Sequence, residues 1–202
     1  MSKRLNFEEA LQAEFRWPQS DDLPFAVDKT QEHNAQILGG VDLRLLAMVE
    51  GYKLGADHMV EKALDDENER NMLVYPIIFN YRQFLELNLK AQIYSFGHYV
   101  GVQANWKTHN LEHLWLLFKE MLEGFGTEDP DQADGVVSNI VAEFSKIDPQ
   151  SYSHRYPVDR NGDALPISRD ELSLSQLRDV MEAVENYFSG CEGFLSNLAQ
   201  AF

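Results

Sequence analysis

Five consecutive residues near the middle of the chain, His109-Asn110-Leu111-Glu112-His113, have types and spacing suited to zinc chemistry. The pattern H-x-x-E-H can place two zinc ligands and a general base on one turn of a helix. Zinc also needs a third protein ligand, and a catalytic site keeps an open coordination position. Glu143, Glu182 and Glu185 follow in the chain, but nothing in the sequence distinguishes one of them as that ligand.

The same segment also fits a purely structural role. On a helix, Leu111, Leu114 and Trp115 would face the core, while Glu112 and His113 would face water. Three fixed positions make a weak motif, so we expect no metal ion and no cofactor. A metal-dependent hydrolase that uses the segment HNLEH is the second of two alternative functions.

A second group of charged residues lies in an apolar stretch of the chain. Arg82, Glu86 and Lys90 are spaced i, i+4 and i+8, so they line one stripe of a helix. Many of their neighbours are apolar, and charges that are partly buried must be paired. The stripe is therefore either a structural ladder of ion pairs or one wall of a cleft that contains other polar groups.

Three further residues are candidates for that cleft. His109 stands at an expected helix N-terminus, and Arg155 and Asp159 lie in a loop rich in turn residues. A helix N-terminus favours anions, and arginine can hold a phosphate with two hydrogen bonds. We predict a ligand-binding set of Arg82, Glu86, Lys90, His109, Arg155 and Asp159, with His109 and Arg155 as catalytic candidates. The simpler alternatives are a His109 bonded to backbone and an Arg155 that anchors the loop.

The elements that must position these residues are helices. Apolar residues recur at three- and four-residue spacing, and no segment alternates as a strand does. We predict an all-α protein, with an N-terminal arm at residues 1–40 and a bundle of about five helices at residues 41–202. The arm holds one short helix at 7–15 and then an extended segment. The expected helices of the bundle span residues 41–66, 71–97, 109–126, 129–149 and 173–202.

Several residues are expected to mark the ends of these helices. Pro76 suits a first turn, Gly97 suits a helix end, and Thr108 suits an N-cap. The remaining signals are Gly124 or Gly126 as the stop of the third helix, and Ser173 or Ser175 near the cap of the last.

Four segments together resemble the HEPN family (higher eukaryote and prokaryote nucleotide-binding domains). They are GYKLGADHMV at 51–60, YRQFLELNLKAQIY at 81–94, THNLEHLW at 108–115 and SYSHRYPVD at 151–159. The resemblance covers residues 41–198. It implies a helical bundle that often dimerises, and many members are metal-independent RNases of toxin–antitoxin, phage-defence and CRISPR-associated systems.

The chain departs from the family at its catalytic motif, Arg-x4-6-His at or near the last helix. Arg178 lies in that helix, but no histidine follows it, and no other arginine is followed by histidine at that spacing. The RNase activity therefore does not carry over. HEPN-like proteins without the motif are thought to bind partners or ligands instead.

Composition limits the partners. The formal net charge is −16, which disfavours bulk binding to DNA. No run approaches the roughly 18 apolar residues of a membrane span, so we expect no membrane partner. The single cysteine, Cys191, fits a reducing cytoplasm. We expect a cytoplasmic, HEPN-like homodimer that recognises RNA, a nucleotide or a protein partner without catalysis, in a prokaryotic defence or toxin–antitoxin setting. The first alternative is a divergent metal-independent RNase that uses His109 and Arg155.

Overall fold

The computed structural model describes residues 16–27, 34–148, 156–158, 161–165 and 170–200. Its contacts divide the chain into two compact units, Met1–Ile37 and Leu38–Phe202. In the described part of the first unit, Arg16 forms an ion pair with Asp22, whose carboxylate also accepts a hydrogen bond from the Gln19 amide. The short helix expected at residues 7–15 lies outside the described residues.

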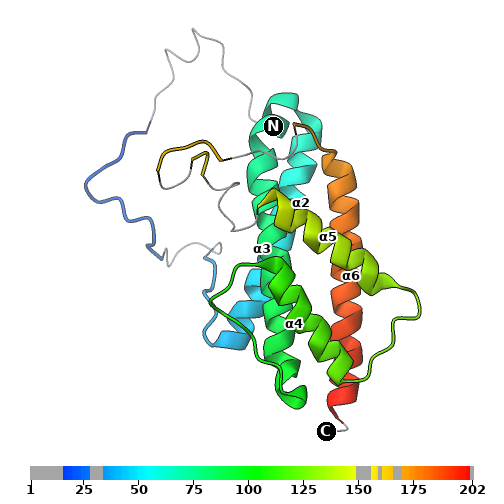
Figure 1. Ribbon diagram of the computed structural model, residues 1–202. Helices are drawn as coiled ribbons and strands as arrows, with labels where there is room; N and C mark the ends of the chain where they lie inside the picture. The colour runs from blue at the N-terminus through cyan, green and yellow to red at the C-terminus, as the bar shows by residue number, and fades with distance from the viewer. Residues whose placement is uncertain (1–15, 28–33, 149–155, 159–160, 166–169, 201–202) are drawn as a thin grey trace. The chain divides into compact units, whose positions relative to one another are not determined.

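The described part of the second unit consists of helices joined by loops, as expected of an all-α bundle (Figure 1). The helices are α2 (Val41–Asp65), α3 (Glu67–Val100), α4 (Leu111–Gly124), α5 (Ala133–Ile147) and α6 (Leu174–Ala199). The described residues form no strand, and their only extended pairing is an isolated bridge between Val158 and Ala164. Over those same residues, no helix combines the length and the apolar character that crossing a bilayer requires.

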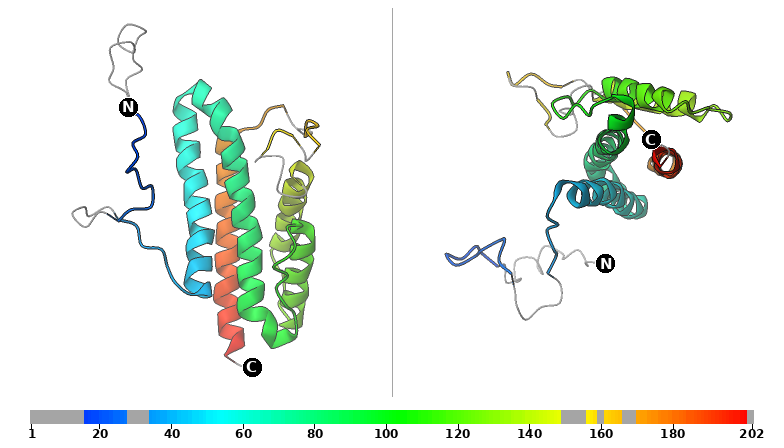
Figure 2. Two further views of the ribbon diagram at one scale, coloured as in Figure 1. Left: turned by 90° about the vertical axis from the view of Figure 1, so that its left-hand side faces the viewer. Right: turned by 90° about the horizontal axis from the view of Figure 1, so that it is seen from below.

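Helix α3 is the centre of this unit. It packs against α2, α4 and α6, while α5 packs on α4 (Figure 2). A helix surrounded by others needs apolar residues all round its axis, and α3 buries residues on several faces, including Ile77, Phe84, Leu85, Leu89 and Ile93. The charged stripe of α3 is therefore held inside the bundle.

The start of α3 differs from the prediction. The helix begins at Glu67, and only Asp66 separates it from the end of α2. The Asp66 side chain caps α3 by accepting hydrogen bonds from the amides of Asn68 at 2.8 Å and Glu69 at 3.2 Å. Pro76 consequently lies inside the helix and not in its first turn. Proline there removes one backbone hydrogen bond, so packing and the cap must compensate for that loss.

The end of α3 also lies beyond the residue expected. The helix continues past Gly97 to Val100, and Gly101 closes it in the left-handed conformation with φ of 81°. Gly97 has another role, because the chain returns over it at Val102, whose amide donates to the Gly97 carbonyl at 2.9 Å. A Cβ at Gly97 would stand 2.4 Å from the carbonyl oxygen of Val102. Glycine is required here for close backbone approach.

The N-cap of α4 is Asn110 and not Thr108. The Asn110 side chain accepts a hydrogen bond from the His113 amide at 2.8 Å, while the Thr108 hydroxyl accepts one from the Asn110 amide at 3.1 Å. His109 therefore precedes the helix. The other end signals are confirmed: α4 ends at Gly124, and the Ser173 hydroxyl caps α6 by accepting from the Gln176 amide.

Candidate functional site

The predicted stripe on α3 is a buried ladder of ion pairs. Arg82, Glu86 and Lys90 have exposed fractions of 0, 2 and 3%. Nη1 of Arg82 donates to Oε2 of Glu86 at 3.0 Å, and Nζ of Lys90 donates to Oε1 of Glu86 at 2.8 Å. One carboxylate thus serves two cations at successive helical turns.

Arg82 also joins three elements of the bundle. Its Nε donates to the backbone carbonyl of Asp148, at the end of α5, over 3.0 Å. Its Nη2 donates to the backbone carbonyl of His109, just before α4, over 2.6 Å. The planar guanidinium presents several donors in fixed directions, which suits it to such a junction. Together with the bond to Glu86, Arg82 makes three hydrogen bonds, and all three acceptors lie within the bundle.

Of the four predicted site residues that the structure describes, only His109 reaches the surface. Its Nδ1 lies 2.9 Å from Oε1 of Glu86, yet its side chain is 61% exposed. Among the described residues, Nε2 of this ring has no hydrogen-bond partner. The Glu86 carboxylate therefore orients an imidazole whose other nitrogen is open to water, the arrangement that a general acid or base requires.

The charges of the cluster balance one another. Burial by itself would raise the pKa of Glu86, but hydrogen bonds from Lys90, His109 and Arg82 and the Lys90 charge hold it below its ordinary value. The Asp148 carboxylate lies 3.9 Å from Nε of Arg82 and is also buried. Among the described residues of the cluster, the two buried cations, Arg82 and Lys90, therefore face two buried carboxylates, Glu86 and Asp148.

The predicted site residues divide into two groups. Arg82, Glu86, Lys90 and His109 lie together, as predicted, whereas Arg155 and Asp159 lie outside the described residues. Pairing within the ladder is confirmed. Five cavities among the described residues are lined by other side chains, and the cleft that would include Arg155 and Asp159 stays a prediction.

The zinc arrangement required His109 and His113 on one turn of a helix, and that premise is wrong because His109 precedes α4. The structural role of the segment is confirmed: Leu111, Leu114 and Trp115 are buried, while Glu112 and His113 are exposed. Over the described residues, no three His, Cys, Asp or Glu side chains are grouped to hold a metal ion.

A second buried polar network, which the sequence analysis does not predict, links α2, α3 and α6. Lys53 of α2 is buried, and its Nζ lies 2.7 Å from Asp57 and 3.0 Å from Glu185 of α6. The Tyr81 hydroxyl donates to the same Asp57 at 2.7 Å. Burial by itself would lower the pKa of Lys53, but its bonds to Asp57 and Glu185 raise it above its ordinary value. The i, i+4 pair Lys53 and Asp57 was the available signal.

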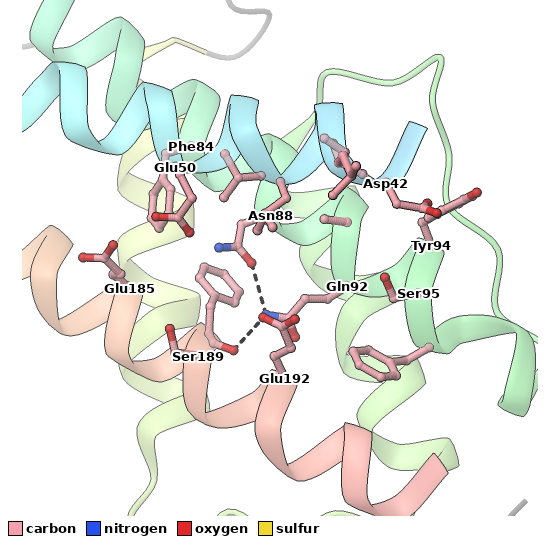
Figure 3. Close-up of a pocket in the computed structure, with 17 residues that line it drawn as sticks. Asp42, Glu50, Phe84, Asn88, Gln92, Tyr94, Ser95, Glu185, Ser189 and Glu192 are labelled. Carbon is pink, nitrogen blue, oxygen red and sulfur yellow. Dashed lines mark hydrogen bonds between the residues drawn. The ribbon is translucent and has the colours of Figure 1, made fainter. Parts of the chain in front are cut away.

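A cavity of about 250 Å³ lies among α2, α3 and α6, and we call it the acidic cavity (Figure 3). Four carboxylates line it, from α2 (Asp42 and Glu50) and α6 (Glu185 and Glu192). Figure 3 places the amide of Gln92, from α3, amid this lining, with hydrogen bonds to Asn88 and to the Phe188 carbonyl. Because its lining comes from three helices, the sequence did not point to it.

Comparison of the chain with protein-family models, with curated proteins and with solved structures gave no match. The HEPN resemblance therefore rests on the four segments that carry it, and the functional argument rests on the residues of the chain itself.

Proposed function

We propose that this chain is a HEPN-like recognition protein that binds a protein partner and does not cleave RNA. The observation that carries the proposal is that the charged groups of the α3 ladder are buried and bonded within the protein. Arg82, Glu86 and Lys90 bond to one another and to the backbone of neighbouring elements. Separating the partners of a buried ion pair is strongly destabilising, and these groups would have to leave their partners before they could act on a substrate.

The charge balance favours protein over nucleic acid as the partner. Phosphate recognition relies on cations that remain available at the surface. Arg82 and Lys90 are buried and are matched by Glu86 and Asp148. With a net charge of −16, the chain as a whole would also repel a polyanion.

The exposed apolar side chains of α2 support a partner of this kind. They are Val41, Leu43, Leu46, Met48, Leu54 and Leu64, of which Leu43 and Leu46 also line the acidic cavity. Apolar side chains gathered on one exposed element are typical of surfaces that bind other proteins. A second copy of the chain is one such partner, as the HEPN resemblance implies, and a cytoplasmic defence or toxin–antitoxin setting follows from that resemblance alone.

Cleavage assays test the non-catalytic part of the proposal. Purified full-length protein would be incubated with single-stranded and structured RNAs, with and without EDTA. We expect no cleavage under either condition and no binding of labelled RNA at about 0.15 M salt. Cleavage that persists in EDTA and disappears in His109→Ala would overturn the proposal.

Substitutions on α2 test whether this helix binds the partner. Leu54→Gln with Leu64→Gln changes two exposed α2 residues, and Leu116→Gln with Val136→Gln makes the same change on α4 and α5. Sedimentation velocity measures self-association, and affinity capture from the host measures other partners. We expect association to be lost in the α2 variant and kept in the control. Equal behaviour of the two variants would exclude α2 as the binding face.

One observation favours a second candidate, a divergent metal-independent RNase. His109 is exposed and is oriented by the buried Glu86 carboxylate, as a catalytic base is oriented by its acidic partner. Arg155, the other residue predicted for this activity, lies outside the described residues. The same cleavage assay separates the two candidates, with Arg155→Ala as an additional variant.

A further inference from the structure

The longer described stretch of the N-terminal arm, residues 16–27, exposes large apolar side chains, and we call it the arm segment. Trp17, Leu23, Phe25 and Val27 have exposed fractions of 76, 74, 96 and 73%. Apolar side chains of this size gain free energy when they leave water for another surface. So many of them in one short segment are typical of a segment that binds a protein.

Local contacts give the arm segment a shape of its own. The Arg16 guanidinium pairs with the Asp22 carboxylate, which also accepts a hydrogen bond from the Gln19 amide at 2.8 Å. A second turn follows, in which the Ala26 amide donates to the Leu23 carbonyl at 3.2 Å. Because these turns already restrict the chain, binding it costs less conformational entropy than binding a random coil.

The bundle carries an apolar groove at the start of α2, and we call it the Trp106 groove. It has a volume of about 420 Å³, and its lining comes from α2, α3 and the loop before α4. Val41, Met48 and Trp106 are 60, 41 and 46% exposed there, so the groove presents apolar surface to a binding partner. The other lining residues are Gly40, Arg44, Leu45 and Leu87.

The charges of the groove and of the arm segment are complementary. Arg44 is the only charged residue among those that line the groove. It forms no ion pair with a described residue, and its Nε donates to the Leu38 carbonyl at 3.4 Å. In the arm segment, Arg16 neutralises Asp22, whereas Asp21 has no ion-pair partner among the described residues. The unmatched cation of the groove therefore suits the unmatched anion of the segment.

The chain between the arm segment and the bundle is long enough to reach a second molecule. Residues 28–39 join the two, and at about 3.3 Å per residue they span at most roughly 40 Å. When two copies exchange identical segments, one association forms two identical contacts. The second contact forms within the complex, at a high effective concentration. A modest contact in each groove is then enough to hold the pair.

We propose that the arm segment of one copy binds in the Trp106 groove of a second copy, so that two chains exchange their arms. Trp17 and Phe25 fill the apolar part of the groove, and Asp21 pairs with Arg44 across the interface. The inference rests on the proposed function, because it names a second copy as the protein partner. It adds the two surfaces that meet, and neither includes Leu54 or Leu64.

Sedimentation velocity of the full-length protein over a range of concentrations tests the inference. We expect the protein to form a dimer, and Trp17→Gln with Phe25→Gln to weaken dimerisation at least about tenfold. The control, Leu116→Gln with Val136→Gln, removes two exposed apolar side chains of α4 and α5 and should change it less than about twofold. A wild-type protein that stays monomeric would overturn the inference.

The same measurement separates this inference from the proposed function. Loss of dimerisation in Leu54→Gln with Leu64→Gln, but not in the arm variant, would leave the α2 face as the binding surface and overturn arm exchange. Loss in the arm variant alone would support arm exchange and exclude the α2 face.

Charge reversal tests the pairing of Asp21 with Arg44. Arg44→Glu and Asp21→Lys should each weaken dimerisation at least about fivefold, and the double variant should return to within about twofold of the wild type. Both residues are exposed, so thermal unfolding of each variant should match that of the wild type. Losses that add in the double variant would overturn the proposed contact.

Mixing two defective variants tests exchange between copies. The Arg44→Glu variant keeps an intact arm segment, and the Trp17→Gln, Phe25→Gln variant keeps an intact groove. Their mixture should form a heterodimer through one intact contact, although each variant alone dimerises weakly. A mixture that stays monomeric would overturn arm exchange.

Discussion

Nη2 of Arg82 lies 2.6 Å from the backbone carbonyl oxygen of His109, so a buried side chain of α3 holds the residue that precedes the N-cap of α4. The same guanidinium holds the end of α5 through the Asp148 carbonyl. Arg82 thereby fixes both the entry to one helix and the exit from another, and the position of the His109 ring follows from it.

Replacing Arg82 tests this junction. Arg82→Met keeps much of the side-chain volume but removes the donor to Oε2 of Glu86 and to two backbone carbonyls. We expect a loss of about 3 to 5 kcal/mol in the free energy of unfolding, measured by urea titration. Arg44→Met, at an exposed arginine of α2, should change it by less than about 0.5 kcal/mol. A small loss for Arg82→Met would show that the ladder is not structural.

Glu86 makes stability depend on pH. Its pKa is lower in the folded protein than its ordinary value of 4.5, so it stabilises the fold above that pH. This contribution is lost as the pH falls through the folded-state pKa. Unfolding free energies measured from pH 7 to about pH 3 should therefore decline less steeply in Glu86→Gln, which starts from a lower stability. Parallel declines in the two proteins would contradict the assignment.

Two tyrosines should resist ionisation. Burial, followed by hydrogen bonds to Asp57 and Asp134, raises the pKa of Tyr81 and of Tyr187 far above the ordinary value of 10.0. Ultraviolet titration should show both phenols ionising only as the protein unfolds. Because their folded pKa values are raised, they stabilise the fold up to about pH 10 and lose that contribution as the pH rises further. Tyr81→Phe and Tyr187→Phe should each remove one late phenol from the titration.

The backbone approach at Gly97 should tolerate no side chain. Gly97→Ala would press its Cβ against the Val102 carbonyl, and we expect a loss of about 1 to 3 kcal/mol in stability. Gly51→Ala lies within α2 with nothing inside 4 Å of the new Cβ. That variant should gain about 0.5 to 1 kcal/mol from helix propensity. Thermal unfolding of the pair would contradict this account if the two changes had the same sign.

The helices were predictable because apolar residues recur with helical spacing, and burial of those residues confirms the pattern. The boundaries of α3 were not. Residues 67–70 are polar and carry no apolar periodicity, and a proline such as Pro76 is typical of the first turn of a helix. In the folded chain, the cap at Asp66 and the packing around α3 determine where the helix begins. Neither can be deduced from the spacing of apolar residues.

The ladder was partly predictable for a related reason. Spacing within one helix brings Arg82, Glu86 and Lys90 together whatever the rest of the fold does. Two of the bonds of Arg82 go to backbone carbonyls, which every residue type carries, so no residue type signals them. The acidic cavity is lined by residues of three helices, and the spacing of residues within each helix does not show how the helices face one another.

Only Asp66 separates α2 from α3, and this has a consequence for the order of assembly. Closing so short a connection loses little chain entropy, whereas α6 must return across most of the chain to meet α2. The α2–α3 hairpin should therefore form before α6 docks. In refolding kinetics, Val60→Ala at that hairpin should slow folding, while Leu195→Ala in α6 should mainly speed unfolding. The acidic cavity would then be completed last, when α6 closes over the finished hairpin.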